Sequence, residues 1–203
     1  MASSSSVPDV IREFAARAVD QVRASVGVAL EWDSDTLPLL DHYLRSAQAE
    51  AADVVALLGA TAGAYFGEVV RLTIGGRWEV GTGEASEWRM VLPTGLAFSP
   101  VDYALSAAVG NHVGSAEHEL TVPAAMRPIV DEALARMSPV TKDEYYSLCG
   151  RLDTLLHLHE VVVGEAGRRL DHANGDGESE TDRGSDLDRD GAGADDAASA
   201  DAV

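Results

Sequence analysis

The chain has 203 residues, of which 46% are hydrophobic, and its formal net charge at pH 7 is −19. This length and composition predict one domain with a substantial core, or one domain with a tail. The negative charge repels phosphate backbones and anionic lipid surfaces, so we expect neither nucleic-acid binding nor membrane association. A single cysteine, Cys149, excludes an intrachain disulfide and a cysteine-cluster metal site.

Cellular location is predicted from two absences in the sequence. The N-terminal segment has neither the basic nor the apolar stretch of a secretory signal. The longest run without a charged residue, Val54 to Gly67, has 14 residues, which is too short to cross a bilayer. We therefore expect a cytoplasmic protein.

The first expected elements are a helix and a short strand. Ser6 suits the N-cap and Pro8 the first turn, and apolar residues then recur at helical spacing as far as Val22. Between residues 26 and 32, apolar side chains alternate with smaller or polar ones, which predicts a strand.

A second helical pattern begins after Ser34, a candidate N-cap, and reaches three glycines spaced four apart: Gly59, Gly63 and Gly67. These glycines would line one helical face, where they permit close helix packing or the approach of a ligand to the backbone. We favour packing, because no phosphate-binding motif accompanies them. A break near Gly59 would divide the pattern into two helices.

Three short strands and a helix are expected next. The strands cover 77–80, 88–92 and 96–98, and their connections predict an antiparallel meander. Ser99 and Pro100 then start a helix, which we expect to stop at Gly110.

The remaining pattern is irregular at first and then helical. Residues 111–123 show no periodicity, and a helix is expected over 128–137. Thr141 and Glu144 form the capping-box signature of a last helix, which we expect to end near residue 169.

These elements predict an α+β fold that is mostly helical, with a small antiparallel sheet of three or four strands. The globular domain is expected to span residues 1–170. Residues 171–203 hold eleven acidic and two basic residues, with few apolar side chains among them. Because such a segment cannot bury enough apolar surface to offset its ordering entropy, we expect a disordered acidic tail.

One candidate catalytic cluster lies in the irregular segment. It consists of His112, Glu117, His118 and Glu119, which could supply a general acid and a general base. The sequence identifies no nucleophile or substrate pocket beside them, so an exposed polar loop is the favoured interpretation.

One candidate metal site lies in the last helix. Asp153, His157 and Glu160 have the spacing that places three ligands for zinc or iron on one helical face. A solvated polar face is the favoured alternative, and we expect no cofactor.

Asp186, Asp188 and Asp190 in the acidic tail resemble the first half of an EF-hand calcium loop. Ala197 stands where such a loop needs a bidentate glutamate, so specific calcium binding is not favoured.

Trp78 and Trp88 are the candidate partner-binding residues. They fall on neighbouring expected strands, where they could stack on each other, pack in the core or anchor a partner at the surface. Core packing is favoured for both tryptophans. For Cys149, a small buried residue is favoured over a reactive thiol, because only Arg151 offers a positive charge beside it.

Four short segments follow one another in a recognisable order: 63–69 (GAYFGEV), 75–78 (GGRW), 92–93 (LP) and 98–100 (FSP). This order resembles a loose group of small bacterial domains of uncharacterised function, over about residues 28–110. The resemblance implies an α+β fold and no established activity, and it carries over no catalytic residue.

From these observations we expect a non-enzymatic protein-interaction module, such as an adaptor or an immunity-like inhibitor. The acidic body and tail favour a basic protein partner, whose association would be fast and sensitive to salt. Two alternatives remain open. One is a metal-dependent or hydrolytic enzyme that uses the 112–119 segment or the His157 face, and the other is a helical component that self-assembles. The sequence does not set the oligomeric state.

Overall fold

The computed structural model describes residues 7–46, 51–114 and 120–175, with side chains up to residue 168. Its α-helices are α1 (Asp9–Val26), α2 (Leu37–Ser46), α3 (Ala52–Thr73), α4 (Pro100–Val109), α6 (Arg127–Arg136), α7 (Lys142–Tyr146) and α8 (Leu148–Gly175). Its strands are β1 (Arg77–Glu79), β2 (Arg89–Val91) and β3 (Ala97–Phe98), and its short 3₁₀ turns are η1 (Ala85–Glu87) and η2 (Ala124–Met126). The expected mostly helical α+β fold is confirmed.

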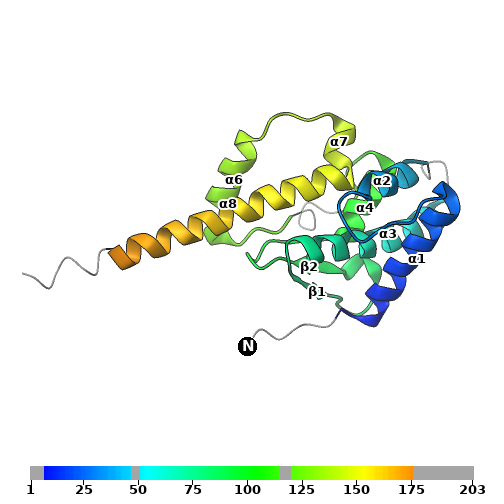
Figure 1. Cartoon of the computed structure of the whole chain (residues 1–203), viewed down its shortest axis with the longest axis horizontal. Helices are drawn as coiled ribbons and strands as arrows, with labels where there is room; N and C mark the ends of the chain where they lie inside the picture. Colours follow the sequence, from blue (N-terminus) through cyan, green and yellow to red (C-terminus); the bar gives the residue numbers. More distant parts are fainter. Residues whose placement is uncertain (1–6, 47–50, 115–119, 176–203) are drawn as a thin grey trace, which may run out of the picture. The chain divides into compact units, whose positions relative to one another are not determined.

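Helix α3 is the centre of the core. It packs against both α1 and α4, and α2 packs against α1 and α4 in turn (Figure 1). The glycines of α3 make the contact with α4 possible, because a Cβ added at Gly63 would lie 2.7 Å from the backbone of Val101. A Cβ at Gly67 would overlap the ring of Trp78. The expected use of these glycines in packing is therefore confirmed.

Helix α3 is also the one described helix that is long and apolar enough to cross a membrane. Its 22 residues contain a window with a mean hydropathy of 1.3, and 72% of that window is buried inside the fold. Helix α3 is thus buried as a core helix is.

The sheet has three antiparallel strands in the order β1-β2-β3. Trp78 pairs with Met90 across the first two strands, and Met90 pairs with Phe98 across the second two. An isolated bridge between Ala97 and Thr121 adds one pair of residues beyond β3. The expected meander is confirmed with three strands.

Two helix starts follow the capping chemistry expected from the sequence. The Ser99 side chain accepts a hydrogen bond from the backbone N–H of Asp102, and α4 ends at Gly110 in the left-handed conformation. The Thr141 side chain accepts in the same way from the backbone N–H of Glu144 at the start of α7.

The strand expected over residues 26–32 is wrong. Helix α1 continues through Val26, and the residues after it form a loop with no strand pairing. Trp32 in that loop has a backbone φ of 62°, which is incompatible with a strand.

The expected break near Gly59 is also wrong. Gly59 lies inside α3 and faces Leu105 of α4, so the glycine closes a packing contact and does not end the helix. The division between α2 and α3 falls between Ser46 and Ala52.

The last helix differs from the expectation at both ends. The segment after Thr141 forms two helices, α7 and α8, which are separated at Ser147. A new helix can begin at Leu148 because the buried carboxylate of Asp41 on α2 caps it. This carboxylate accepts hydrogen bonds from the backbone N–H groups of Leu148 (2.8 Å) and Cys149 (3.2 Å).

Helix α8 extends to Gly175, so the domain boundary expected after residue 170 falls inside a helix. The rest of the expected acidic tail, residues 176–203, lies outside the described residues.

Candidate functional site

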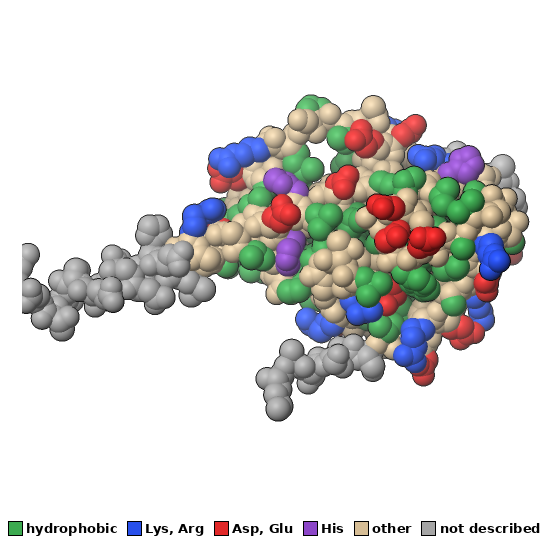
Figure 2. Space-filling model, in the orientation of Figure 1, with side chains coloured by type: hydrophobic (Ala, Val, Ile, Leu, Met, Phe, Trp, Pro, Cys, Tyr) green, Lys and Arg blue, Asp and Glu red, His purple; other side chains and the backbone are tan. Residues whose placement is uncertain are grey.

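One cavity in the described part of the chain is a groove of about 930 Å³ bordered by α4, α6, α7 and the first turns of α8. We call it the α6–α8 groove, and Figure 2 shows the hollow beneath the segment that joins α6 to α7. Its lining consists of Tyr103, Leu120, Val122, Arg127, Val130, Asp131, Leu134, Met137, Ser138, Pro139, Val140, Lys142, Glu144, Tyr145, Tyr146, Gly150, Arg151, Asp153, Thr154 and Leu155.

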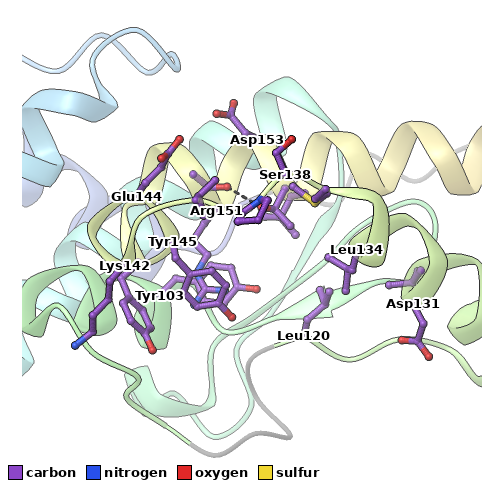
Figure 3. A pocket seen from close by; sticks show the side chains of 18 of the residues that line it. Tyr103, Leu120, Asp131, Leu134, Ser138, Lys142, Glu144, Tyr145, Arg151 and Asp153 are labelled. Carbon is purple, nitrogen blue, oxygen red and sulfur yellow. Dashed lines mark hydrogen bonds between the residues drawn. The ribbon is translucent and has the colours of Figure 1, made fainter.

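One end of the groove is a cluster of tyrosines around Arg151. The guanidinium carbon of this buried arginine lies 4.5 Å from the ring centroid of Tyr103 and 4.4 Å from that of Tyr145. A third ring, that of Tyr146, lies 5.7 Å away. These cation–π contacts connect α4, α7 and α8, and they hold the tyrosines at this end of the groove (Figure 3).

Large apolar side chains lie at the other end and on the rim of the groove. Leu120 and Leu134 lie at the end opposite the tyrosines (Figure 3). Leu134 is 41% exposed, Val140 on the connecting segment is 49% exposed and Tyr145 is 47% exposed. Large apolar side chains around a concave surface are typical of binding sites.

The charges around the groove balance one another. Three of its lining residues are acidic and three are basic: Asp131, Glu144, Asp153, Arg127, Lys142 and Arg151. The groove is therefore close to neutral within a chain of net charge −19. Shape and apolar contact, more than charge, would select what it binds.

The groove lining contains no histidine or cysteine among its described residues. The hydroxyl group of Thr154 donates a hydrogen bond to the backbone carbonyl of Gly150 at 2.9 Å. Its proton is therefore bonded within α8 and not to a general base.

The expected catalytic cluster is described only in part. His112 is exposed on the loop after α4, whereas Glu117, His118 and Glu119 lie outside the described residues.

The three candidate metal ligands Asp153, His157 and Glu160 are all exposed on α8. No group of three or more histidine, cysteine or carboxylate side chains is placed to share a metal ion in the described part of the chain. Asp153 instead lines the α6–α8 groove. The candidate calcium ligands Asp186, Asp188 and Asp190 lie in the segment that is not described.

Trp78 and Trp88 are both buried, so neither is presented at the surface as a partner anchor. The indole N–H of Trp78 donates to the carboxylate of Glu68 at 2.6 Å, and the Arg71 side chain also donates to that carboxylate. Trp88 packs edge-on against Phe14 of α1, with ring centroids 5.1 Å apart. The favoured core placement is confirmed for both.

Cys149 is half-buried at the start of α8, and its pKa is raised to about 12. Burial is the largest cause, and the nearby negative charge of Asp41 adds to it. A thiol of this pKa is protonated at neutral pH, which agrees with an unreactive cysteine.

Sequence reasoning missed the groove and the exposed tryptophan, Trp32. The groove draws on residues 103–155, and no short motif marks it. Trp32 did carry a signal, because acidic residues stand on both sides of it, which is unusual in a buried strand.

No family model, curated protein or solved structure matches this chain.

Proposed function

We propose that this chain is a non-enzymatic, cytoplasmic protein-interaction module that binds a short apolar segment of a partner protein in the α6–α8 groove. One observation carries the proposal: the groove combines a tyrosine–arginine cluster with apolar side chains that are left partly exposed. Tyrosine, tryptophan and arginine supply much of the binding energy in protein interfaces. An adaptor or an inhibitory protein would present such a surface.

The size of the groove supports a peptide segment as its occupant. Its volume of about 930 Å³ is near the upper end of ordinary ligand sites and holds several side chains at once. Because the groove itself is close to neutral, the apolar side chains of the segment would supply the affinity. The net charge of −19 would act at longer range and speed the approach of a basic partner.

The test compares two leucine substitutions in the full-length protein. Leu134→Asp places a carboxylate in the groove, where a bound segment would have to desolvate it. Leu72→Asp is the matched control, because Leu72 is a helical leucine that is 56% exposed on α3 and does not line the groove. Circular dichroism and thermal melts establish that both variants are folded.

Each protein is immobilised and exposed to a lysate of the source cells, and bound proteins are quantified by mass spectrometry. We expect a partner that wild type and Leu72→Asp retain equally, and that Leu134→Asp binds at least about tenfold more weakly. Equal retention by both variants would contradict the groove. Light scattering that shows a stable assembly of this chain, dispersed by Leu134→Asp, would favour self-assembly instead.

Salt dependence tests the electrostatic contribution separately. Raising the ionic strength from about 0.05 M to about 0.5 M shortens the Debye length several-fold, so association of a basic partner should slow. An association rate that does not change with salt would remove this part of the proposal and leave the groove itself intact.

A further inference from the structure

The chain exposes one of its three tryptophans. Trp32 is 38% exposed, whereas Trp78 and Trp88 are buried. Tryptophan is the residue most enriched among the dominant contacts of protein interfaces, because it brings a large apolar area at a low cost in side-chain entropy. A solvated indole on a loop that joins two helices is therefore a candidate anchor.

The structure holds this indole in one orientation. Its ring packs against the ring of Tyr65, with ring centroids 5.1 Å apart and an interplanar angle of 36°. The backbone N–H of Trp32 donates to the Tyr65 hydroxyl oxygen at 3.0 Å. Tyr65 is fully buried in α3, and its hydroxyl group also bonds to that of Thr36 at 3.1 Å. A ring fixed in this way loses little freedom when a partner covers it.

The residues around Trp32 are acidic. Glu31, Asp33 and Asp35 surround it in sequence, and no lysine or arginine occurs between Arg23 and Arg45. Glu31 and Asp35 are exposed. Neither forms an ion pair within the part of the chain that the structure describes, so both carboxylates face solvent without a neutralising cation.

We propose that residues 28–36, the Trp32 loop, form a second docking surface, which binds a basic protein surface with an apolar slot for the Trp32 ring. Lysine or arginine side chains of the partner would surround that slot and meet Glu31 and Asp35. This surface differs from the α6–α8 groove, which is close to neutral and is lined by none of these residues. The inference does not depend on the function proposed for the groove.

The ring is removed by Trp32→Gly in the full-length protein. Glycine is chosen because Trp32 has a φ of 62°, which glycine adopts without strain. Leu72→Ala is the control, since it removes an exposed apolar side chain from α3 and belongs to neither the Trp32 loop nor the α6–α8 groove. Thermal melts of both variants check that the fold survives.

Lysate proteins retained on a cation-exchange column serve as the probe, so that only basic proteins are offered. We expect at least one that wild type and Leu72→Ala bind equally, and that Trp32→Gly binds about tenfold more weakly or worse. Retention of every captured protein by Trp32→Gly at the wild-type level would overturn the proposal. Capture that is weakened equally by Trp32→Gly and Leu72→Ala, or no capture by wild type, would overturn it as well.

Two further measurements separate the ring from the charges. The fluorescence of Trp32 should shift to shorter wavelength when the captured protein binds, whereas the buried tryptophans should contribute no shift. The double variant Glu31→Gln, Asp35→Asn should lower the association rate several-fold. Its control is Glu84→Gln, Asp53→Asn, which changes the charge equally at exposed residues elsewhere. Equal slowing by both pairs would overturn the local charge argument.

The two proposals fail in different ways. Loss of a partner from Leu134→Asp, with normal binding by Trp32→Gly, supports the groove and refutes the loop. The opposite pattern supports the loop and refutes the groove.

Discussion

Cys149 lies beside a buried carboxylate, and this neighbour determines much of its chemistry. Burial and the charge of Asp41 together raise the pKa of the thiol to about 12, from its ordinary value of 9.0. At pH 8 the thiolate fraction is then about a thousandfold lower than in an unfolded chain, although a thiolate of higher pKa is intrinsically more nucleophilic. Native Cys149 should therefore resist alkylation.

We predict that iodoacetamide labels Cys149 at least about tenfold more slowly in the native protein than in urea at pH 8. The folded pKa lies above the unfolded one, so the neutral thiol contributes stability below pH 9, and this contribution is lost as the pH rises toward 12. Labelling followed by mass spectrometry measures the first effect. Equal rates in the two states would contradict the pKa shift.

Trp32 shows how a single residue can depart from local preference. A bulky residue in the left-handed region costs on the order of 1–3 kcal/mol, and such conformations persist only where the surroundings enforce them. Here the backbone N–H bond to Tyr65 and the ring contact with Tyr65 enforce it. The apolar alternation over 26–32 could not reveal this, because the decisive partner lies 33 residues further along the chain.

At the scale of whole elements, helices with local capping signals were predicted well. Ser99, Pro100 and Gly110 bound α4 because serine accepts from a first-turn N–H and glycine adopts the left-handed C-cap. The start of α8 was missed because its cap comes from Asp41, which is 107 residues away from Leu148. Sequence patterns within a helix cannot show such a distant partner.

The packing of α3 on α4 depends on glycine at Gly63, and we predict that Gly63→Ala destabilises the protein by about 2 kcal/mol or more. The added Cβ would lie 2.7–2.9 Å from the backbone of Pro100 and Val101, and backbone cannot move aside as a side-chain end can. Denaturant unfolding followed by circular dichroism measures the loss.

Gly167→Ala is the control, because nothing lies within 4 Å of a Cβ at this position in α8. Alanine should be neutral there or stabilise the helix by up to about 1 kcal/mol. Similar losses from both substitutions would contradict contact with α4 as the cause, because alanine favours a helix more than glycine does.

The carboxylate of Asp41 caps α8 from a distance, and we predict that Asp41→Ala costs about 1–3 kcal/mol of unfolding free energy. The substitution leaves the buried N–H groups of Leu148 and Cys149 without their acceptors. It also removes a negative charge that raises the pKa of Cys149, so alkylation of the thiol should become faster. Asp35→Ala, at an exposed loop position, is the control and should change neither quantity.

For the whole molecule, the excess of acidic residues is the dominant electrostatic feature. A net charge of −19 in 203 residues destabilises the compact state through repulsion between like charges. We predict that raising the salt concentration from about 0.02 M to about 0.5 M increases the melting temperature by a few degrees, because salt screens this repulsion. Calorimetry in chloride salts checks it, and an unchanged or lower melting temperature would contradict it.

The α6–α8 groove forms only when several helices pack together, so no sequence pattern predicted it. Tyr103, Leu134 and Arg151 come from three helices that are separate in the chain, and each alone is an ordinary helical residue. Hydrophobic periodicity predicted the helices that carry them. The relation between those helices depends on tertiary packing, which periodicity does not encode.

The capping of α8 by Asp41 has a consequence for the order in which the protein is made. Translation produces α2 long before α8, yet the acceptor on α2 obtains its two donors only when residues 148 and 149 have emerged from the ribosome. Until then the carboxylate must stay hydrated or be buried without partners, and the second course is costly. A nascent chain that lacks Leu148 and Cys149 therefore gains less from burying Asp41 and completing its N-terminal core.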